Sequence, residues 1–423
     1  MQSFLQKLTL IVSDAQLRNR FLFVLGVLAV FRLLAAVPIP GIDAAQLQLF
    51  FQNNQFFGLL NLFSGGGLAG LSLMMLGVGP YITASIIMQL LTIMVPHLKQ
   101  LYQEEGELGR KKFAQYSRLL TLPIAIIQGL SFILILERQG VLSQLSQFQL
   151  GVNILVITAG SILLMWLGEL ISEFGLGNGV SLIIFAGIVA RLPRDASQLI
   201  FSFETSQIPV YLGFLAAALV IIAAVVVITE AERPVPVTYA KRVRGMKFFG
   251  GSSTYLPLRL NQAGVIPIIF ALSFLLLPQM FATFFQASSH AWLASVSNFM
   301  LSWLQNLAFY GAVYFIFVVL FTYFYTAVTF DPHQIAENLQ KNGAFIPGVR
   351  PGVPTSDYLA KVITRITLVG ALFLGLIAVL PIAMQSITGI STLTIGGTAL
   401  LIVVSVILDL ARRVDAQISI REY

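Results

Sequence analysis

The chain has 423 residues, of which 57% are hydrophobic and only 10% are charged, and its formal net charge is +7. Long uncharged runs of this kind are typical of integral membrane proteins and exclude an ordinary soluble domain. The absence of cysteine excludes disulfides and thiolate metal sites. The three histidines, His97, His290 and His333, are far apart and match no metal-ligand motif, so we predict neither a metal nor a cofactor.

Ten apolar stretches are candidates for membrane-spanning helices, which need roughly 20 residues each. They are 21–37, 78–95, 119–136, 153–171, 180–192, 210–229, 262–283, 307–329, 367–385 and 393–410. The second and fifth are the shortest. The N-terminus lacks the pattern of a cleaved signal peptide, so we expect the first span to remain in the mature protein.

Lysine and arginine are distributed very unevenly over the segments that connect these spans. With ten spans, the side that holds both termini carries 21 of the 25 basic residues, the other side carries 3, and Arg32 lies within the first span. Basic residues accumulate on the cytoplasmic side of membrane proteins. We therefore predict ten spans with both termini cytoplasmic, or stromal in a plastid, and the sequence leaves plasma and thylakoid membranes open.

The segment NLFSGGGLAGLSLMMLGVGPY, residues 61–81, is apolar but is broken by glycines and a proline before the second span. Non-helical backbone is tolerated at membrane depth only where protein or a water-filled cavity satisfies its polar groups. We expect this segment to lie inside the protein rather than against lipid.

Aliphatic side chains stand beside these helix breakers at a spacing of one helical turn. Val78 and Ile82 open the second span, and Val180 and Ile184 open the fifth. Such residues could form a hydrophobic constriction that closes by excluding water. Ordinary packing between helices is the alternative that their periodicity leaves open.

The loop at 230–260 is the richest in basic residues, and it interleaves Lys241, Arg242, Arg244 and Lys247 with aromatic residues. This mixture suits an RNA backbone or a protein docking groove. The alternative is that the charges only set topology and contact anionic lipid headgroups.

Two segments share a local pattern that indicates internal symmetry. Residues 77–82, GVGPYI, and residues 264–269, GVIPII, lie five spans apart, so matching elements would have opposite orientations. This is the signature of an inverted repeat with a functional centre at the interface. A chance match in a chain rich in glycine and valine is the alternative.

The spans contain almost no charge, which argues against enzyme chemistry and ion coupling. Arg32, Glu169 and Asp409 are the main exceptions, and no nucleotide-binding loop, nucleophile elbow or paired-carboxylate motif is present. Arg32 is expected to pair with a backbone carbonyl or a neighbouring helix as a structural anchor. We predict that the chain is not an enzyme.

Long motifs follow one another along nearly the whole chain. They are FRLLAAVPIPGID (31–43), LFSGGGLAGLSLMMLGVGPYITASIIMQLL (62–91), GELGRKKFAQYSRLLTL (106–122), GNGVSLIIFAGIVARLP (177–193), YAKRVRG (239–245), STYLPLRLNQAGVIPIIF (253–270), NLQKNGAFIPGVRPG (338–352) and GGTALLIVVSVILDL (396–410). Together they resemble the SecY family, the central channel subunits of bacterial-type protein translocases.

The resemblance implies an all-α integral membrane fold of ten transmembrane helices in two inverted pseudo-symmetric halves with a re-entrant plug half-helix. The halves would be 21–193 and 194–410, between a cytoplasmic segment at 1–20 and a cytoplasmic tail at 411–423, with large cytoplasmic loops at 230–260 and 330–366. Such a channel translocates secretory polypeptides across the membrane and releases transmembrane segments sideways into it.

The resemblance also assigns residues to the parts of the channel. The pore ring would be Val78, Ile82, Val180, Ile184, Ile269 and Ile402, with valine at Val78 and Val180 where many bacterial relatives have isoleucine. The plug, about 62–73, would include Leu62, Phe63, Ser64, Gly65, Gly66, Gly67 and Leu68. The lateral gate would lie between spans 2 and 3 and spans 7 and 8, with Thr83 and Gln128 as its polar positions.

The expected partners are the small membrane subunits SecE and SecG, the SecA motor, the ribosome, signal peptides, nascent chains and the lipid bilayer. Lys241, Arg242 and Lys247 resemble positions that dock the ribosome or SecA, and Arg350 resembles the family's most sensitive cytoplasmic arginine. Met246 stands where the family often has arginine.

Two other functions remain open from the residues alone. Helix breakers at mid-membrane are equally expected in a secondary transporter built from inverted repeats. Such a transporter would need ionisable groups inside the membrane, which the spans lack. A scaffold for the assembly of membrane subunits would leave the aliphatic ring unexplained.

Overall fold

The computed structural model describes residues 13–39, 71–103, 105–138, 142, 145–193, 197, 208–239, 242–244, 247–249, 253–285, 290–388 and 394–421. Its helices are α2 (Ala15–Ala35), α5 (Gly79–Met94), α6 (Pro96–Gln103), α7 (Gly106–Arg138), α8 (Gln147–Phe174), α9 (Gly179–Val189), α11 (Ile208–Glu230), α12 (Ile266–Phe285), α13 (Ala291–Gln305), α14 (Leu307–Thr329), α15 (Pro332–Lys341), α16 (Val353–Thr388) and α17 (Thr394–Arg421). Its strands are β1 (Glu232–Tyr239), β2 (Arg242–Arg244), β3 (Lys247–Phe249), β4 (Ser253–Arg259) and β5 (Ala344–Phe345).

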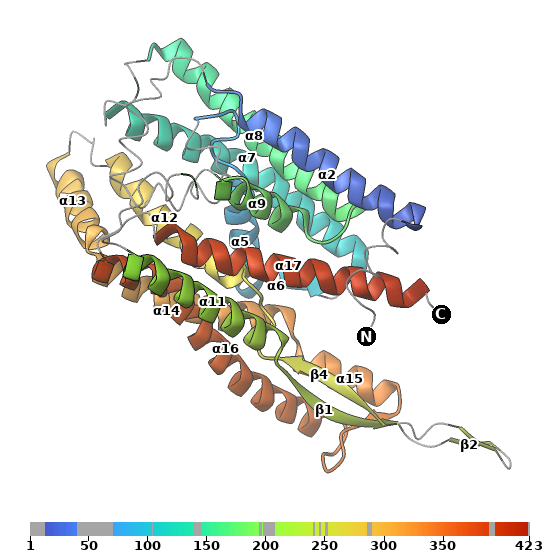
Figure 1. Ribbon diagram of the computed structural model, residues 1–423. Coiled ribbons are helices and arrows are strands. Elements are labelled where there is room, and N and C mark those ends of the chain that lie inside the picture. The colour runs from blue at the N-terminus through green and yellow to red at the C-terminus, as the bar shows by residue number, and fades with distance from the viewer. Residues whose placement is uncertain are drawn as a thin grey trace.

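The helices form an elongated bundle, with the strands and α15 at one end and α13 at the opposite end (Figure 1). Every predicted span falls mainly on one helix, and the eighth, 307–329, coincides with α14. Several helices extend beyond the predicted spans: α7 begins at Gly106, α16 at Val353, and α17 continues to Arg421. These extensions are the charged parts of long helices, which a hydropathy pattern assigns to loops.

Four helical stretches of the described chain are long and apolar enough to cross a membrane by themselves: 106–137, 147–174, 307–341 and 353–380. A fifth crossing is possible if α5 and α6 are counted as one span, although they meet at a bend of 115°. Three shorter apolar helices lie at 179–189, 215–230 and 266–279. Pro96 follows the last residue of α5 closely, which explains the break, because proline removes a helical hydrogen bond.

The first described helix has a clear start and a charge at its end. The Asp14 carboxylate accepts hydrogen bonds from the backbone N–H groups of Gln16 and Leu17, at 2.8 and 3.2 Å. This N-cap satisfies donors that a helix leaves unpaired. Arg32 lies in the last turn, where its charge is favourable at the negative end of the helix dipole. Arg32 is therefore near the helix end rather than at the centre of the span.

Three of the strands form a small sheet at the basic end of the molecule, where no regular structure was predicted, and β2 and β3 pair separately. Its order is β4-β1-β5, and β1 pairs antiparallel with β4. Pro234 lies opposite Pro257, and Pro236 lies opposite Tyr255. Because Pro234 and Pro236 are two residues apart, their backbone nitrogens lie on the same side of β1. This side faces away from β4, so the N–H groups that proline lacks are not needed for the pairing of β1 with β4.

One face of this sheet packs against the start of α16. Val235 and Val237 of β1 and Leu258 of β4 are buried in one cluster with Leu359 and Ile363 of α16. Each fully buried aliphatic side chain contributes about 1.5–3 kcal/mol. The sheet is thereby fixed to the part of α16 that extends beyond the predicted span.

Candidate functional site

The six residues of the expected pore ring come from four separate helices and lie in one apolar cluster. Val78 and Ile82 belong to the start of α5, Ile184 to α9, Ile269 to α12 and Ile402 to α17, and all five are buried, with 1–7% of their surfaces exposed. Val180 at the start of α9 is half-buried and packs against the same cluster. A constriction made of these side chains offers no dipole to replace the hydration shell of an ion.

The start of α5 and the start of α12 have the same local geometry. Gly77 and Gly264 adopt left-handed backbone conformations, with φ of 60° and 62°. Each helix begins two residues later, and its second residue is a proline, Pro80 or Pro267. Ile82 and Ile269 therefore occupy equivalent positions in the first turn. The match predicted from the sequence thus extends to the backbone.

The start of α9 is held against α8 by a serine and by glycines. The Ser172 hydroxyl donates to the Gly168 carbonyl at 3.0 Å and accepts from the Gly179 N–H at 2.9 Å. A Cβ on Gly179 would overlap the Gly168 carbonyl oxygen, and one on Gly168 would lie 3.2 Å from Cγ2 of Val180. The absence of side chains at both positions allows α9 to approach α8 closely, which places Val180 and Ile184.

The segment that leads into α5 is anchored to the end of α2. The Ile39 N–H donates to the Leu71 carbonyl at 2.8 Å, and the Leu73 N–H donates to the Val37 carbonyl at 3.1 Å. Leu71 is 1% exposed and has a φ of 37°, the one positive φ at a described residue other than glycine. This buried anchor is the C-terminal end of the expected plug, about 62–73, whose residues Leu62–Leu68 lie outside the described part of the chain.

The same segment also touches α8. A Cβ on Gly160 would overlap the Leu73 carbonyl oxygen. Leu71, Met75 and Ile157 are buried together beside this contact. The end of the expected plug that leads into α5 is therefore fixed on two sides, by the end of α2 and by α8.

The expected lateral gate corresponds to α5 and α7 on one side and α12 and α14 on the other. Phe270 and Phe274 of α12 make edge-to-face contacts with Phe321 and Phe317 of α14, with ring centroids 6.0 and 5.2 Å apart. Such pairs contribute about 0.5–1.5 kcal/mol beyond area burial. α12 also packs against α5 and α7, which closes the seam between the two pairs of helices.

The two polar gate positions differ in their surroundings. Thr83 is buried, and its hydroxyl donates to the Gly79 carbonyl of its own helix at 3.0 Å. Gln128 is half-buried in α7. The threonine is satisfied within α5, so it places no unpaired polar group in the closed seam.

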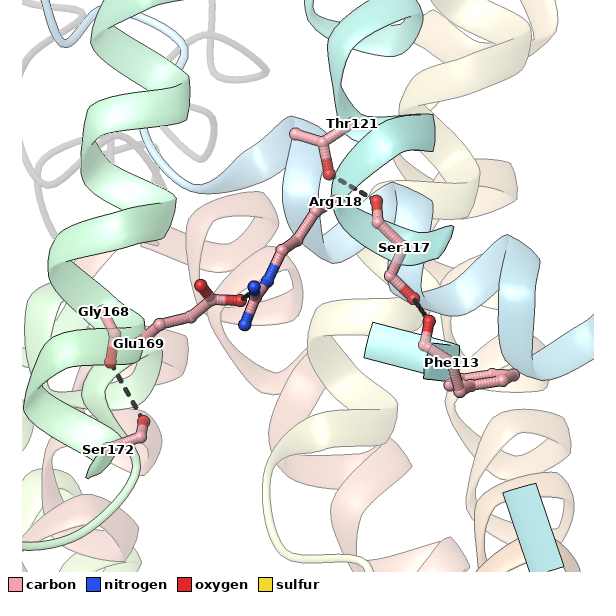
Figure 2. Close-up of polar contacts among 7 residues, drawn as sticks. All are labelled: Phe113, Ser117, Arg118, Thr121, Gly168, Glu169 and Ser172. Atoms are coloured by element: carbon pink, nitrogen blue, oxygen red, sulfur yellow. Dashed lines mark hydrogen bonds and ion pairs between the residues drawn. The ribbon is translucent and has the colours of Figure 1, made fainter. Parts of the chain in front are cut away.

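The acidic residues within the predicted spans, Glu169 and Asp409, are both paired with arginine. Figure 2 shows the Arg118 side chain of α7 reaching Glu169 of α8, with Nε and Oε1 2.6 Å apart. Asp409 pairs with Arg413 in α17 at 3.0 Å. Such short ion pairs are structural, because both partners stay within one helix or tie neighbouring helices. They do not form the mid-membrane relay that a transporter needs.

The predicted docking residues lie at the end that carries the sheet. Arg242 and Lys247 belong to β2 and β3, which pair in a hairpin that projects beyond β1 and β4 (Figure 1). Lys241 lies outside the described part of the chain. Arg350 is exposed between β5 and α16, and its carbonyl accepts a hydrogen bond from the Thr355 hydroxyl at 2.8 Å. Gly348 and Gly352, with φ of 84° and 94°, flank it and set a tight loop.

Nearby, α15 carries an exposed ion pair. The Lys341 ammonium lies 2.8 Å from the Glu337 carboxylate, one turn away. The hydrogen bond from Lys341 and its charge lower the pKa of Glu337. The exposed ion pair leaves α15 polar on its outer face. In the residues that the structure describes, no group of three or more histidine, cysteine or acidic side chains could hold a metal.

Sequence reasoning missed three features of the site. They are the contact of Gly160 with Leu73, the link from Ser172 to Gly179, and helix α13. The first two carry no local signal that separates them from ordinary membrane sequence. The exposed aromatic residues of α13 at helical spacing could have indicated that helix.

Comparisons with known proteins agree with this arrangement. A sequence profile of the SecY family matches residues 72–411. The protein translocase subunit SecY of Mycobacterium bovis is 42% identical over 428 residues, which cover 96% of each chain. The corresponding subunit of Thermus thermophilus is 43% identical and covers 96% of this chain and 94% of its own.

Solved structures share the fold. One described as a protein conducting channel has a TM-score of 0.65 and 18% sequence identity, covering 94% of this chain and 91% of that chain. Sec61 in the canine ribosome-channel complex from the endoplasmic reticulum has a TM-score of 0.62 and 17% identity, with the same coverage.

Proposed function

Because the chain belongs to the SecY family and is a channel subunit of the protein translocase rather than an enzyme, we propose that the cluster of Val78, Ile82, Val180, Ile184, Ile269 and Ile402 is its pore seal. The observation that carries this proposal is that residues from four separated parts of the sequence share one buried apolar cluster. Membership of this family also decides against a secondary transporter and an assembly scaffold.

The seal acts by chemistry that its side chains can supply. Aliphatic side chains change rotamers easily and fit around a passing polypeptide, yet they offer no polar group to an ion. Water leaves such a constriction when no polypeptide fills it. Residues 62–73 act as a plug that reinforces the closed state, and the last residues of this plug, Leu71 and Leu73, anchor it beside the end of α2.

The lateral gate is the seam between α12 and the pair α5 and α7. Because α12 and α14 are joined by edge-to-face aromatic contacts, they open as one unit against α5 and α7. Thr83 and Gln128 lie on the other side of this seam. When a signal sequence enters this seam, α12 loses its apolar contacts with α5 and α7, and the signal sequence replaces them.

The basic end is the docking face for partners. Lys241, Arg242, Lys247 and Arg350 contact the SecA motor and the ribosome, a role supported by the likeness to Sec61 in a ribosome-channel complex. SecE and SecG are the companion membrane subunits. The chain divides into two halves, at 21–193 and 194–410. The segments 1–20 and 411–423, and with them both termini, lie in the cytoplasm if the protein is in a plasma membrane, or in the stroma if it is in a thylakoid membrane.

The test of the seal compares two neighbouring residues of α17. Ile402 and Leu401 are both 1% exposed in the same cluster, but only Ile402 belongs to the proposed ring. Each is replaced by asparagine, and ion leak is measured in vesicles that contain the purified translocase complex. Ile402→Asn should raise resting leak and relax the selection of poor signal sequences, whereas Leu401→Asn should affect folding alone.

Ile402→Val is a second control, because it keeps the apolar surface and should stay tight. Equal leak from Ile402→Asn and Leu401→Asn, or no leak from either, would remove Ile402 from the seal. For the plug, deletion of residues 62–70, which spares the anchor at Leu71 and Leu73, should raise resting permeability, and a deletion variant as tight as the parent would exclude that role.

A further inference from the structure

Helix α13 (Ala291–Gln305) lies between α12 and α14, at the end of the bundle opposite the sheet (Figure 1). Its sequence, AWLASVSNFMLSWLQ, contains no charged residue. α13 packs against both α12 and α14, so one side of it is covered by protein. The remaining surface is unusual for a helix outside the spans, because its largest side chains point away from the protein.

The side chains of α13 fall into three sectors when successive residues are placed about 100° apart around the helix. One sector faces the bundle and contains the buried Ser297 with the half-buried Leu293, Met300, Leu301 and Leu304. A second sector, within about 60°, holds four apolar residues spaced at helical intervals. These are Trp292, Val296, Phe299 and Trp303, with exposed fractions of 67%, 56%, 64% and 49%.

The third sector is polar and lies on the opposite side of the apolar sector from the bundle-facing one. Ser295, Asn298 and Ser302 form it, and all three are exposed. A helix surrounded by water would have no reason to separate its exposed surface into an aromatic stripe and a polar stripe. A helix that lies along a membrane surface needs this separation, with one face toward protein, one toward lipid and one toward water.

The aromatic stripe continues onto the lipid-facing surface of a membrane helix. The Trp303 ring contacts Phe309 of α14 edge-to-face, with centroids 4.8 Å apart. Further along α14, Ile316 and Leu320 expose 54% and 59% of their surfaces. Since α14 is one of the helices long and apolar enough to cross the membrane, the stripe and this surface form one apolar region that meets the bilayer.

We propose that α13 is an interfacial membrane helix whose stripe of Trp292, Val296, Phe299 and Trp303 is buried in the headgroup–acyl boundary of the leaflet opposite the basic face. The occupant of this surface is phospholipid. Tryptophan is enriched at this depth because its ring is apolar and its N–H reaches polar headgroups. Without charge on α13, binding depends on apolar burial, so it should be insensitive to salt and to anionic lipid.

Three consecutive residues allow a sharp test, because Ser295, Val296 and Ser297 fall in the polar, lipid and protein sectors respectively. The chain contains no cysteine, so a single introduced cysteine is the only site on it for a nitroxide label. Ser295→Cys, Val296→Cys and Ser297→Cys are each labelled and reconstituted as the translocase complex in phosphatidylcholine vesicles. Collision with oxygen, which concentrates in lipid, and with a water-soluble nickel chelate is measured by power saturation.

The proposal expects label 296 to collide mostly with oxygen, label 295 mostly with the nickel chelate, and label 297 with neither. Phe299→Cys and Asn298→Cys should repeat the contrast between 296 and 295. Preferential collision of label 296 with the nickel chelate would place the stripe in water and overturn the proposal. Protection of label 296 from both reagents would show that protein covers the stripe and would overturn it equally.

Discussion

Gly77 and Gly264 lie in equivalent positions before α5 and α12 and share a left-handed backbone, with φ of 60° and 62°. In each case the helix begins two residues later with a proline at its second position. Residues with a side chain seldom adopt this conformation, so glycine is required at both places for a steric reason. The equivalence relates the two halves of the chain through backbone geometry.

Replacing either glycine by alanine should destabilise the protein. For Gly264→Ala, a Cβ would meet no atom within 4 Å, so the cost comes from the backbone alone, roughly 1–2 kcal/mol. Thermal unfolding of the detergent-purified complex measures it. Gly26→Ala is the control, because its Cβ also meets nothing within 4 Å and its position in α2 favours alanine by about 1 kcal/mol. A Gly264→Ala variant as stable as Gly26→Ala would contradict the argument.

Gly160→Ala should displace the segment that carries Val78. The added Cβ would overlap the Leu73 carbonyl oxygen, which is backbone and cannot rotate away. We expect lower thermal stability, by about 1–3 kcal/mol for overpacking, together with a higher resting ion leak. Gly151→Ala on the same helix is the matched control, since its Cβ meets nothing within 4 Å. A leak as low as that of Gly151→Ala would separate this contact from the seal.

The Arg118–Glu169 ion pair should couple α7 to α8 modestly. Its side chains are 46% and 21% exposed, so a double-mutant cycle with alanine should give at most about 1 kcal/mol, reduced by salt. The pair of Lys111 and Glu107, 71% and 84% exposed within α7, is the reference and should give about 0.3–0.5 kcal/mol. Equal coupling energies for both pairs would mean that an ion pair between two helices stabilises the protein no more than an ion pair within one helix.

Arg350→Glu should impair SecA-driven export more than assembly of the complex. Arg350 is exposed in the tight loop between Gly348 and Gly352, and one lost charge-assisted contact costs about 1.5–3 kcal/mol, or tenfold or more in affinity. Export into inverted vesicles and recovery of intact complex are measured together. Lys341→Glu changes the charge equally on neighbouring α15 and should export normally. A parallel loss of export and assembly would indicate a folding role for Arg350.

The positions of the helices could be predicted from the sequence because hydropathy and helix breakers act locally. The predicted spans agree with the helices within a few residues where the apolar stretch ends at a proline, glycine or asparagine, as at α5, α9 and α14. They fail at the charged extensions of α7 and α16, because a helix continues into water wherever its backbone hydrogen bonds persist. Helix α13 was not predicted, because its 15 residues are too few to form a membrane span.

Residues 78, 82, 180 and 184 stood out because each pair lies one turn apart beside a helix breaker, whereas Ile269 and Ile402 were assigned through family resemblance alone. Only the tertiary structure decided that side chains from α5, α9, α12 and α17 share one cluster. It also decided that Gly160 contacts Leu73 and that Arg118 reaches Glu169, 51 residues away. Local sequence sets which face of a helix is apolar, but the neighbour that covers this face depends on how all the helices pack together.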